Sequence, residues 1–286
     1  IKCKSIVIPN GIDKFWIYNK INGKKRPKNN ELKIIYVGTI DLNKCKLSKI
    51  DQSVGKLTRL QELYCNNNVL ISFENITFPN SLKILVASNN TLSSIDNKIC
   101  EIKNLRDLEL TNNKIGHINP NIIKLKKLRY LHLDHNFISI FQANLCEMNL
   151  VCINLSFNHL TFLPASIGKL KSLRSLLLDN NQIQEFPKEF YELTGLQLLS
   201  AKNNKIRLIS ESITQMISLE YINLDGNNLT NFNPVAKEFI DNVNKKFTKL
   251  NPHPQNLINT HFPASRSNQN FRSKPRLSSD FSKMSK

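Results

Sequence analysis

The sequence predicts an α/β solenoid, in which a curved parallel β-sheet of about nine repeats ends in a C-terminal capping helix. Two observations lead to this prediction. One pattern, L-x-x-L-x-L-x-x-N-x-L, recurs along some two thirds of the chain, and its asparagines are always 22 or 23 residues apart. After the last copy the apolar spacing becomes that of a helix. Repeats of this length are typical of a stacked fold in which each unit contacts only its neighbours.

Eight copies of the pattern follow one another in phase. The clearest begin at Leu105, Leu128 and Leu173, and weaker ones begin at 60, 82, 150, 196 and 219. A first copy, starting at Val37, has Cys45 in the asparagine position, so the repeats extend from 37 to 232. The asparagines are Asn68, Asn90, Asn113, Asn136, Asn158, Asn181, Asn204 and Asn227.

Each copy predicts a short strand with one buried face. Apolar positions 4 and 6 alternate with polar positions 3, 5 and 7, which is the period of a β-strand. A single such strand cannot bury its apolar face, so stacked copies have to share one core. We expect the asparagine at position 9 to end the strand and to bond backbone groups of adjacent turns. Losing such a buried bond costs about 1–3 kcal/mol.

These residues resemble the leucine-rich repeat family. The second half of each unit, as in residues 163–173, is similar to the 23-residue Ras-group subclass of intracellular scaffolds. The resemblance implies a right-handed solenoid with a signalling role, with small GTPases or phosphatases as partners. Six scattered cysteines form no CxxC pair, which favours a reducing compartment. We therefore expect a cytoplasmic protein.

The segment after the repeats predicts a cap. Asn233 and Pro234 are typical of a helix start, and Val235, Phe239 and Val243 follow at helical spacing, as does residue 247. We predict a capping helix over 233–247, because an open solenoid end would expose its apolar core. Residues 248–286 are rich in polar residues and poor in aliphatic ones, so we expect a disordered basic tail.

The N-terminal flank carries a second resemblance. Residues 7–13 (V-I-P-N-G-I-D) and 34–41 (I-I-Y-V-G-T-I-D) look like the start of the nucleotide-sugar domain of GT-B (family 4-like) glycosyltransferases. The resemblance covers about 45 residues. We interpret residues 1–33 as a basic flank that is a fusion relic or a gene-model junction, with chance similarity as the alternative. Residues 34–42 are a strand under either interpretation.

The net charge of +18 is concentrated at the two ends of the chain. Residues 1–50 carry a net charge of +9, residues 236–286 carry +7, and the long middle, 51–235, carries only +2. Basic tails can contact nucleic acid or anionic lipid in a salt-sensitive way. The distribution favours solvated flanks over a dedicated nucleic-acid site, and no apolar run is long enough for a membrane span.

The concave face carries the candidate binding site. Positions 2, 3, 5, 7 and 8 are expected to point out from the inner curve, so their side chains are free for function. Apolar side chains occupy several of these positions in the five repeats that begin at residues 128, 150, 173, 196 and 219. Aspartates and the two arginines Arg129 and Arg174 border them. Exposed apolar groups ringed by charge indicate protein binding. The predicted partner-binding residues are Tyr130, His132, Asp134, Cys152, Phe157, Leu177, Asp179, Leu198 and Tyr221.

Signals for catalysis are weak. His132, Asp134, His135 and Cys152 are metal-ligand types, but polar residues on a solvated strand explain them equally well. Ser156 beside Asp134 and His132 has no predicted pocket or oxyanion hole. We expect no catalytic residue, cofactor or metal.

The sequence thus favours a monomeric, non-catalytic scaffold that binds a protein partner on its concave face. One alternative is a glycosyltransferase-derived protein that binds a sugar nucleotide. Another is nucleic-acid or membrane association through the basic flanks.

Overall fold

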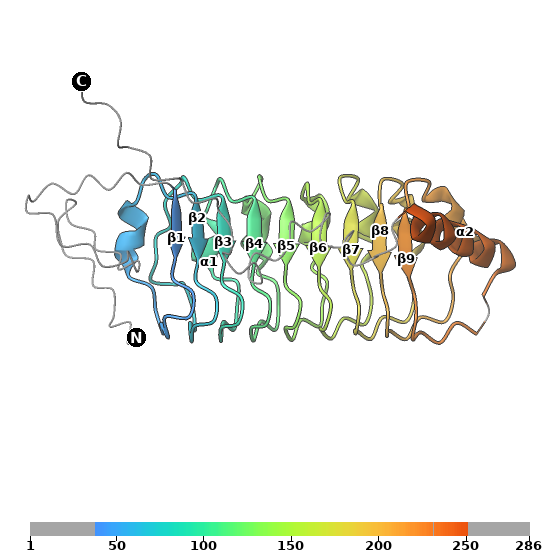
Figure 1. Cartoon of the computed structure of the whole chain (residues 1–286), viewed down its shortest axis with the longest axis horizontal. Helices are drawn as coiled ribbons and strands as arrows, with labels where there is room; N and C mark the ends of the chain where they lie inside the picture. Colours follow the sequence, from blue (N-terminus) through green and yellow to red (C-terminus); the bar gives the residue numbers. More distant parts are fainter. Residues whose placement is uncertain (1–37, 231, 251–286) are drawn as a thin grey trace, which may run out of the picture.

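The repeats form one parallel β-sheet. A computed structural model describes residues 38–230 and 232–250. In this part of the chain nine three-residue strands pair in sequence order, each with the next (Figure 1). The predicted α/β solenoid is therefore confirmed. The strands are β1 (Thr39–Asp41), β2 (Glu62–Tyr64), β3 (Ile84–Val86), β4 (Asp107–Glu109), β5 (Tyr130–His132), β6 (Cys152–Asn154), β7 (Ser175–Leu177), β8 (Leu198–Ser200) and β9 (Tyr221–Asn223).

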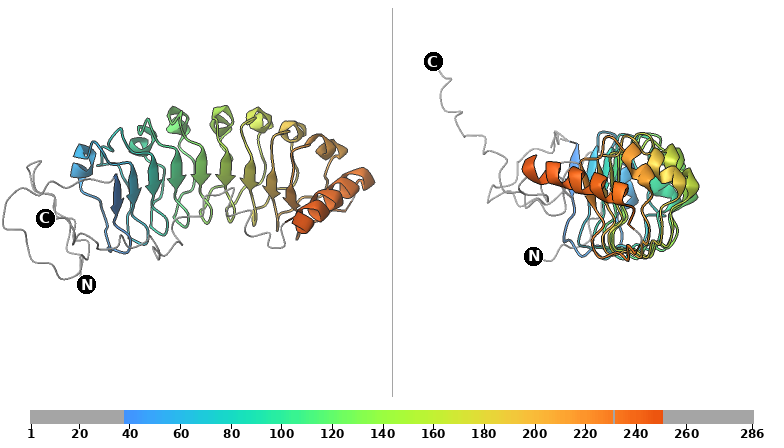
Figure 2. Two further views of the ribbon diagram at one scale, coloured as in Figure 1. Left: turned by 45° about the horizontal axis from the view of Figure 1, so that its top comes forward. Right: turned by 90° about the vertical axis from the view of Figure 1, so that its right-hand side faces the viewer.

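Short helices cover the outer side of the arc, while the strands line its inner side (Figure 2). Six of these seven helices are 3-10 helices of five residues each. The connection from β2 to β3 has no helix. The helices are η1 (Gln52–Lys56), α1 (Asn97–Cys100), η2 (Pro120–Lys124), η3 (Ala143–Glu147), η4 (Ala165–Lys169), η5 (Lys188–Glu192) and η6 (Glu211–Gln215).

The register keeps equal positions of the pattern side by side. Leu108 of β4 pairs with Leu131 of β5, and Leu131 pairs with Ile153 of β6. All three side chains are fully buried between the sheet and the outer helices. A slip of one residue would turn this whole apolar row outward, so core burial fixes the register.

The asparagines form a ladder through the solenoid, as expected. Asn136 Nδ2 donates to the carbonyl oxygens of Leu110 and Leu133, at 3.0 Å each. Its Oδ1 accepts from the backbone N–H of Ile115 at 3.0 Å. The other seven asparagines make the same three kinds of bond. Each asparagine thus joins its own repeat to the preceding one.

The residue before each asparagine position turns the chain with a positive φ. This angle lies between 53° and 58° in the first eight repeats and is 70° at Gly226. Five of these residues are asparagine, which tolerates the left-handed region better than other non-glycine residues. His135 and Phe157 hold the same conformation, with φ of 54° each.

Helix α2 (Pro234–Leu250) covers the C-terminal end of the sheet (Figures 1 and 2). Asn233 Oδ1 accepts from the backbone N–H of Val235 at 2.8 Å, which is the predicted N-cap. The helix ends three residues later than the 233–247 that its apolar spacing predicts. Its buried face also differs: Val235 is exposed, and the buried side chains are Ala236, Ile240, Val243 and Phe247.

Some predictions concern residues outside 38–230 and 232–250. These are the glycosyltransferase-like segment before residue 38, and with it the basic flank 1–33, and the tail after residue 250. Residues 38–41, which the second resemblance includes, lie in the first turn of the solenoid, where Thr39 pairs with Glu62. None of the helices in the described part of the chain has the length and hydrophobicity that a bilayer crossing requires.

Candidate functional site

The predicted apolar residues do meet on the concave face. Cys152, Leu177 and Leu198 pack against one another on β6, β7 and β8, and Tyr130 and Tyr221 pack at the two ends of this group. We call these five residues the concave cluster. The cluster is separate from the main core, which lies on the opposite face of the sheet.

The exposure expected for the cluster is wrong for three of its members. Cys152 and Leu198 are 0% exposed and Leu177 is 7% exposed, whereas Tyr130 and Tyr221 are half-buried. In the register of the sheet Cys152 lies between Tyr130 and Ser175, and Leu198 lies between Ser175 and Tyr221. Neighbouring strands lie only about 4.8 Å apart, so these side chains cover one another, and Leu177 packs against them from position 5. A partner would therefore contact the two tyrosines, with the three buried side chains as the floor between them.

His132 is also buried, contrary to the expectation of an accessible side chain. It lies on β5 next to Glu109 of β4, and both are nearly inaccessible. Burial lowers the pKa of His132 to about 4. The imidazole is therefore neutral at physiological pH and helps to build the face instead of presenting a charge.

Asp134 is held in place by neighbours on both sides. Its Oδ1 accepts from Thr111 Oγ1 at 2.8 Å and from Asn154 Nδ2 at 3.0 Å. Burial raises the pKa of this carboxyl group, and the hydrogen bond from Thr111 partly opposes that shift. A carboxylate fixed in this way has little rotamer freedom left to lose on binding.

Asp179 has an equivalent arrangement two repeats further on. Its Oδ1 accepts from Ser200 Oγ at 2.6 Å and from the backbone N–H of Lys202 at 2.8 Å. Burial again raises the carboxyl pKa, against the hydrogen bond from Ser200. Asp225 follows at the same position after another two repeats and is exposed. Acidic groups thus follow the ends of the strands.

Basic groups lie at the opposite ends of the strands. Arg129 Nη1 donates to the carbonyl oxygen of Leu128 at 3.1 Å, and Arg174 Nη1 donates to that of Leu173 at 3.0 Å. The concave cluster therefore has arginines on the side where the strands start and aspartates on the side where they end. This charge separation would favour one orientation of a bound segment over the reverse.

Phe157 does not belong to the concave cluster. Its ring stacks on His135, with centroids 4.0 Å apart and planes at 11°, and it is 46% exposed. Position 8 lies beyond the strand, at the left-handed turn, so its side chain leaves the concave face. The sequence pattern alone did not distinguish this position from the strand positions.

The structure also shows exposed apolar residues that the sequence analysis missed. Phe137, Ile140 and Phe162 are exposed in the same two repeats as Phe157, and the ring of Phe137 lies 5.9 Å from that of His159. They hold positions 10 and 13, where most repeats have polar residues. That departure from the repeat consensus is the signal that could have revealed them.

The groups considered for catalysis are engaged in the structure of the face or lie outside the strands. Ser156 Oγ accepts from the backbone N–H of Asp179 at 3.2 Å, and His132 is buried while His135 lies outside the strand. Among residues 38–230 and 232–250, no three His, Cys, Asp or Glu side chains are placed to hold a metal ion.

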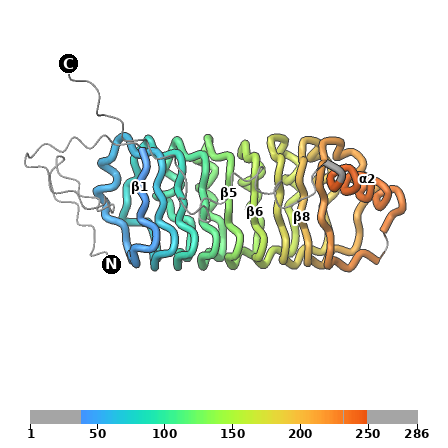
Figure 3. The backbone as a smooth tube through the Cα atoms, in the orientation of Figure 1, coloured from blue at the N-terminus to red at the C-terminus, as the bar shows by residue number. Residues whose placement is uncertain are grey.

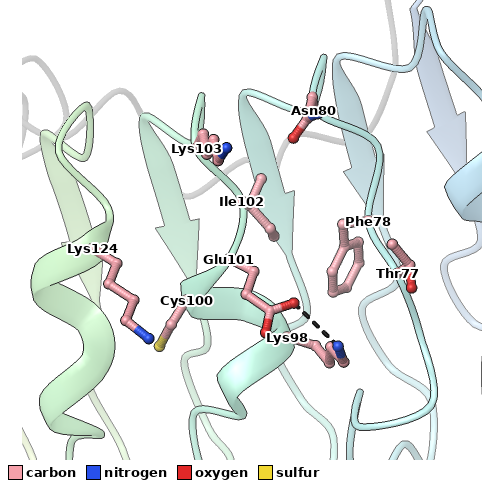
Figure 4. Close-up of a pocket in the computed structure, with 9 residues that line it drawn as sticks. All are labelled: Thr77, Phe78, Asn80, Lys98, Cys100, Glu101, Ile102, Lys103 and Lys124. Carbon is pink, nitrogen blue, oxygen red and sulfur yellow. Dashed lines mark hydrogen bonds and ion pairs between the residues drawn. The ribbon is translucent and has the colours of Figure 1, made fainter.

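A hollow of about 470 Å³ lies on the outer side, next to the connection that has no helix (Figure 4). Phe78 and Ile102 line it together with lysines, of which Lys98 forms an ion pair with Glu101 at 3.1 Å. Cys100 also lines it, and burial raises the pKa of this thiol to about 12, so it is not a reactive nucleophile. Three lysines, Lys98, Lys103 and Lys124, lie among the lining residues together with Thr77, Asn80 and Glu101, and we assign no ligand to this hollow.

Comparison with known proteins supports the class of fold and of protein. The leucine-rich repeat family model matches residues 80–138 and 148–206. Together with the repeat geometry and the similar solved structures, this identifies a leucine-rich repeat protein. The comparison with curated proteins finds no match.

Similar solved structures agree with this identification. A leucine-rich repeat protein of Leptospira interrogans is 32% identical with a TM-score of 0.66, and the match covers 73% of this chain and 53% of that protein. A plant peptide hormone receptor in complex with RGF2 is 29% identical with a TM-score of 0.54, covering 65% and 35%. An internalin of Listeria monocytogenes is 21% identical with a TM-score of 0.59, and the match covers 68% of this chain and 55% of the internalin. At this identity the likeness supports the fold only. The chain spans about half the length of the two bacterial structures and about a third of the length of the plant receptor.

Proposed function

We propose that this chain is a non-catalytic scaffold that binds a protein partner on the concave face of its leucine-rich repeat solenoid. The observation that carries this proposal is the concave cluster with its charged borders. An apolar strip that is separate from the core and flanked by charges of opposite sign is the usual composition of a protein-binding surface.

The half-buried tyrosines would be the anchors of this surface. Tyr130 and Tyr221 lie at the two ends of the cluster, four strands' width apart. Tyrosine contributes a large apolar area and a polar hydroxyl at low cost in side-chain entropy, and it is enriched among residues that dominate binding energy. The buried Cys152, Leu177 and Leu198 would support these anchors from below, while Phe157 would contact the same partner only at its edge.

Rigidity would supply much of the affinity. The asparagine ladder fixes neighbouring repeats, and the hydrogen bonds to Asp134 and Asp179 fix the acidic border before any partner arrives. A surface that is already ordered loses little conformational entropy on binding. We therefore expect the partner to bind a face that is already formed, and we do not expect the solenoid to fold around its ligand.

The nature of the partner follows from resemblance alone. The similar plant receptor was solved with RGF2 bound. The Ras-group resemblance of residues 163–173 points to a small GTPase or a phosphatase, to signalling and to the cytoplasm. These finer assignments are part of the proposal.

The test uses the full chain as bait in a cell lysate, with captured proteins identified by mass spectrometry. Tyr130→Ala and Asp179→Asn should each lose the same partner, because one removes an anchor and the other a fixed charge. Ile217→Ser is the matched control, since Ile217 is an exposed apolar residue away from the concave face. All three variants should keep the far-ultraviolet circular dichroism of the wild type. Retention of every partner by Tyr130→Ala would refute the proposal.

A further inference from the structure

The loops that follow the strands form a continuous side of the solenoid, which we call the strand-end edge. It consists of positions 8, 10, 12 and 13 of each repeat. Backbone bonds hold these loops in line: Phe137 N–H donates to the carbonyl oxygen of Ile115 at 2.9 Å, and His159 N–H donates to that of Ile138 at 2.8 Å. The same bond recurs from repeat two to repeat nine, so the loops lie side by side (Figure 3).

Exposed apolar side chains are concentrated on this edge. In the described residues, seven of the nine large hydrophobic side chains that are exposed hold its positions. Four of them lie in repeats five and six, where the His135–Phe157 stack and the Phe137–His159 contact join neighbouring loops. The seven are Val69, Ile71, Phe137, Ile140, Phe157, Phe162 and Leu208.

The charges on the strand-end edge are almost all positive. Between residues 44 and 230 its positions hold six lysine or arginine residues, all exposed, and a single acidic residue, Glu185. The concave face differs, because its aspartates lie one position earlier in the repeat. The six basic residues are Lys44, Lys46, Lys49, Lys114, Lys205 and Arg207.

One of the edge residues, Phe157, is held in a backbone conformation that is unfavourable for its side chain, whereas histidine tolerates the same conformation better. His135 and Phe157 have φ of 54°, at a position where five other repeats have asparagine. A bulky aromatic residue in the left-handed region is unfavourable relative to asparagine or glycine. Strain of this kind persists at sites with a function, and here it places an aromatic ring on the outside of the molecule.

We propose that the strand-end edge docks on an anionic membrane surface. Aromatic side chains favour the boundary between headgroups and hydrocarbon, and lysine and arginine next to them are attracted by acidic lipids. A row of loops in line can bring all these groups to one surface at once. The concave cluster would stay accessible in this orientation, and Phe157 is the one residue that the two proposed sites share.

The test measures binding of the full chain to vesicles by co-sedimentation. Wild-type protein should bind vesicles of phosphatidylserine and phosphatidylcholine, bind pure phosphatidylcholine vesicles far less, and dissociate as salt is raised. Phe157→Asn should lower the partition coefficient about tenfold, because it removes a ring that inserts into the interface. The variant keeps the residue that other repeats use at this position, so a loss of binding cannot be attributed to unfolding.

Matched controls separate the edge from the basic ends of the chain, which every variant retains. Ile217→Ser removes an apolar residue that is even more exposed than Phe157 but lies outside the strand-end edge, and it should bind like the wild type. Lys205→Gln with Arg207→Gln should weaken binding more than Lys103→Gln with Lys127→Gln, although both pairs remove two charges. The proposal would be overturned if Phe157→Asn and Ile217→Ser lost vesicle binding equally, or if the two double variants did. Equal binding of the wild type to both kinds of vesicle would also overturn it.

A spectroscopic readout shows whether the edge is inserted. A Phe162→Trp variant, combined with Trp16→Phe to remove the native tryptophan, should shift its emission to the blue when anionic vesicles are added. An unchanged spectrum with bound protein would show that the flanks carry the binding, and the proposal for the edge would be wrong.

Discussion

Asn244 of α2 bonds both backbone groups of Ile222 in the last strand. Its Nδ2 donates to the Ile222 carbonyl oxygen at 2.8 Å, and its Oδ1 accepts from the Ile222 N–H at 3.2 Å. These are groups that a tenth strand would otherwise satisfy. Phe247, one turn later, packs its ring against Tyr221 with centroids 4.9 Å apart. The helix therefore closes the sheet by hydrogen bonds as well as by covering its core.

Replacing this asparagine should destabilise the protein. We expect Asn244→Leu to lower the free energy of unfolding by about 1–3 kcal/mol, because it leaves the N–H and C=O of Ile222 without partners. Urea denaturation followed by circular dichroism measures the change. Asn242→Leu on the exposed side of the same helix is the control. Equal effects of the two substitutions would show that the bond to Ile222 contributes nothing specific.

An asparagine of the ladder should contribute more to the free energy of unfolding than an asparagine on the surface. Asn136→Ala removes partners from two buried carbonyl oxygens and one buried N–H, so we expect a loss of at least about 3 kcal/mol. Asn144→Ala removes only a long, exposed bond of 3.3 Å to Pro120 and should cost less than about 1 kcal/mol. Equilibrium denaturation of both variants gives the comparison, and similar losses would contradict it.

Phe157→Asn should make the protein more stable. The substitution relieves the left-handed strain, worth about 1–2 kcal/mol, but it also removes the stack on His135, worth about 0.5–1.5 kcal/mol. We expect a small net gain, seen as a higher melting temperature. Phe162→Ser, which removes an exposed ring from the same edge without a change at position 8, should show no gain. A lower melting temperature for Phe157→Asn would mean that the stack outweighs the strain.

Stability should fall as the solution becomes acidic, and His132 should cause part of that fall. Burial lowers its folded-state pKa from 6.5 to about 4. The unfolded chain therefore binds the proton first, and stability present above pH 6.5 is lost as pH falls toward 4. We expect a contribution of about 2 kcal/mol between pH 7 and pH 5. Asp134 and Asp179 have carboxyl pKa values raised above 3.8 by burial, so the folded state binds these protons first. Their effect therefore has the opposite sign and develops as the pH falls from the raised pKa to about 3.8.

Denaturation at pH 7 and pH 5 measures this contribution. His132→Gln should reduce the pH dependence, whereas His117→Gln, which changes an exposed histidine, should leave it as in the wild type. The assignment to His132 would be wrong if both variants kept the full dependence.

The periodic features of this fold could be predicted from sequence, and the features that depend on local geometry could not. Leucine spacing and the asparagine interval fix the strands, the register and the ladder, since each repeat must match the next. Alternation could not show that Cys152 and Leu198 are fully buried on the concave face, because the pattern gives the side of a strand and not what covers that side. It likewise placed Phe157 on the strand face, although a left-handed turn carries its ring to the edge.

The asparagine bonds also give the solenoid a direction. Asn136 reaches back to the N–H of Ile115 and the carbonyl oxygen of Leu110, both in the repeat before it, and Asn244 does the same for β9. The backbone groups of each repeat are therefore hydrogen-bonded, and the repeat is secured, by the asparagine of the repeat that follows it. Shortening the protein from the N-terminal side leaves every remaining unit secured, while shortening it from the C-terminal side always frees the last one. During synthesis, each new unit would become secure only once the following asparagine has left the ribosome.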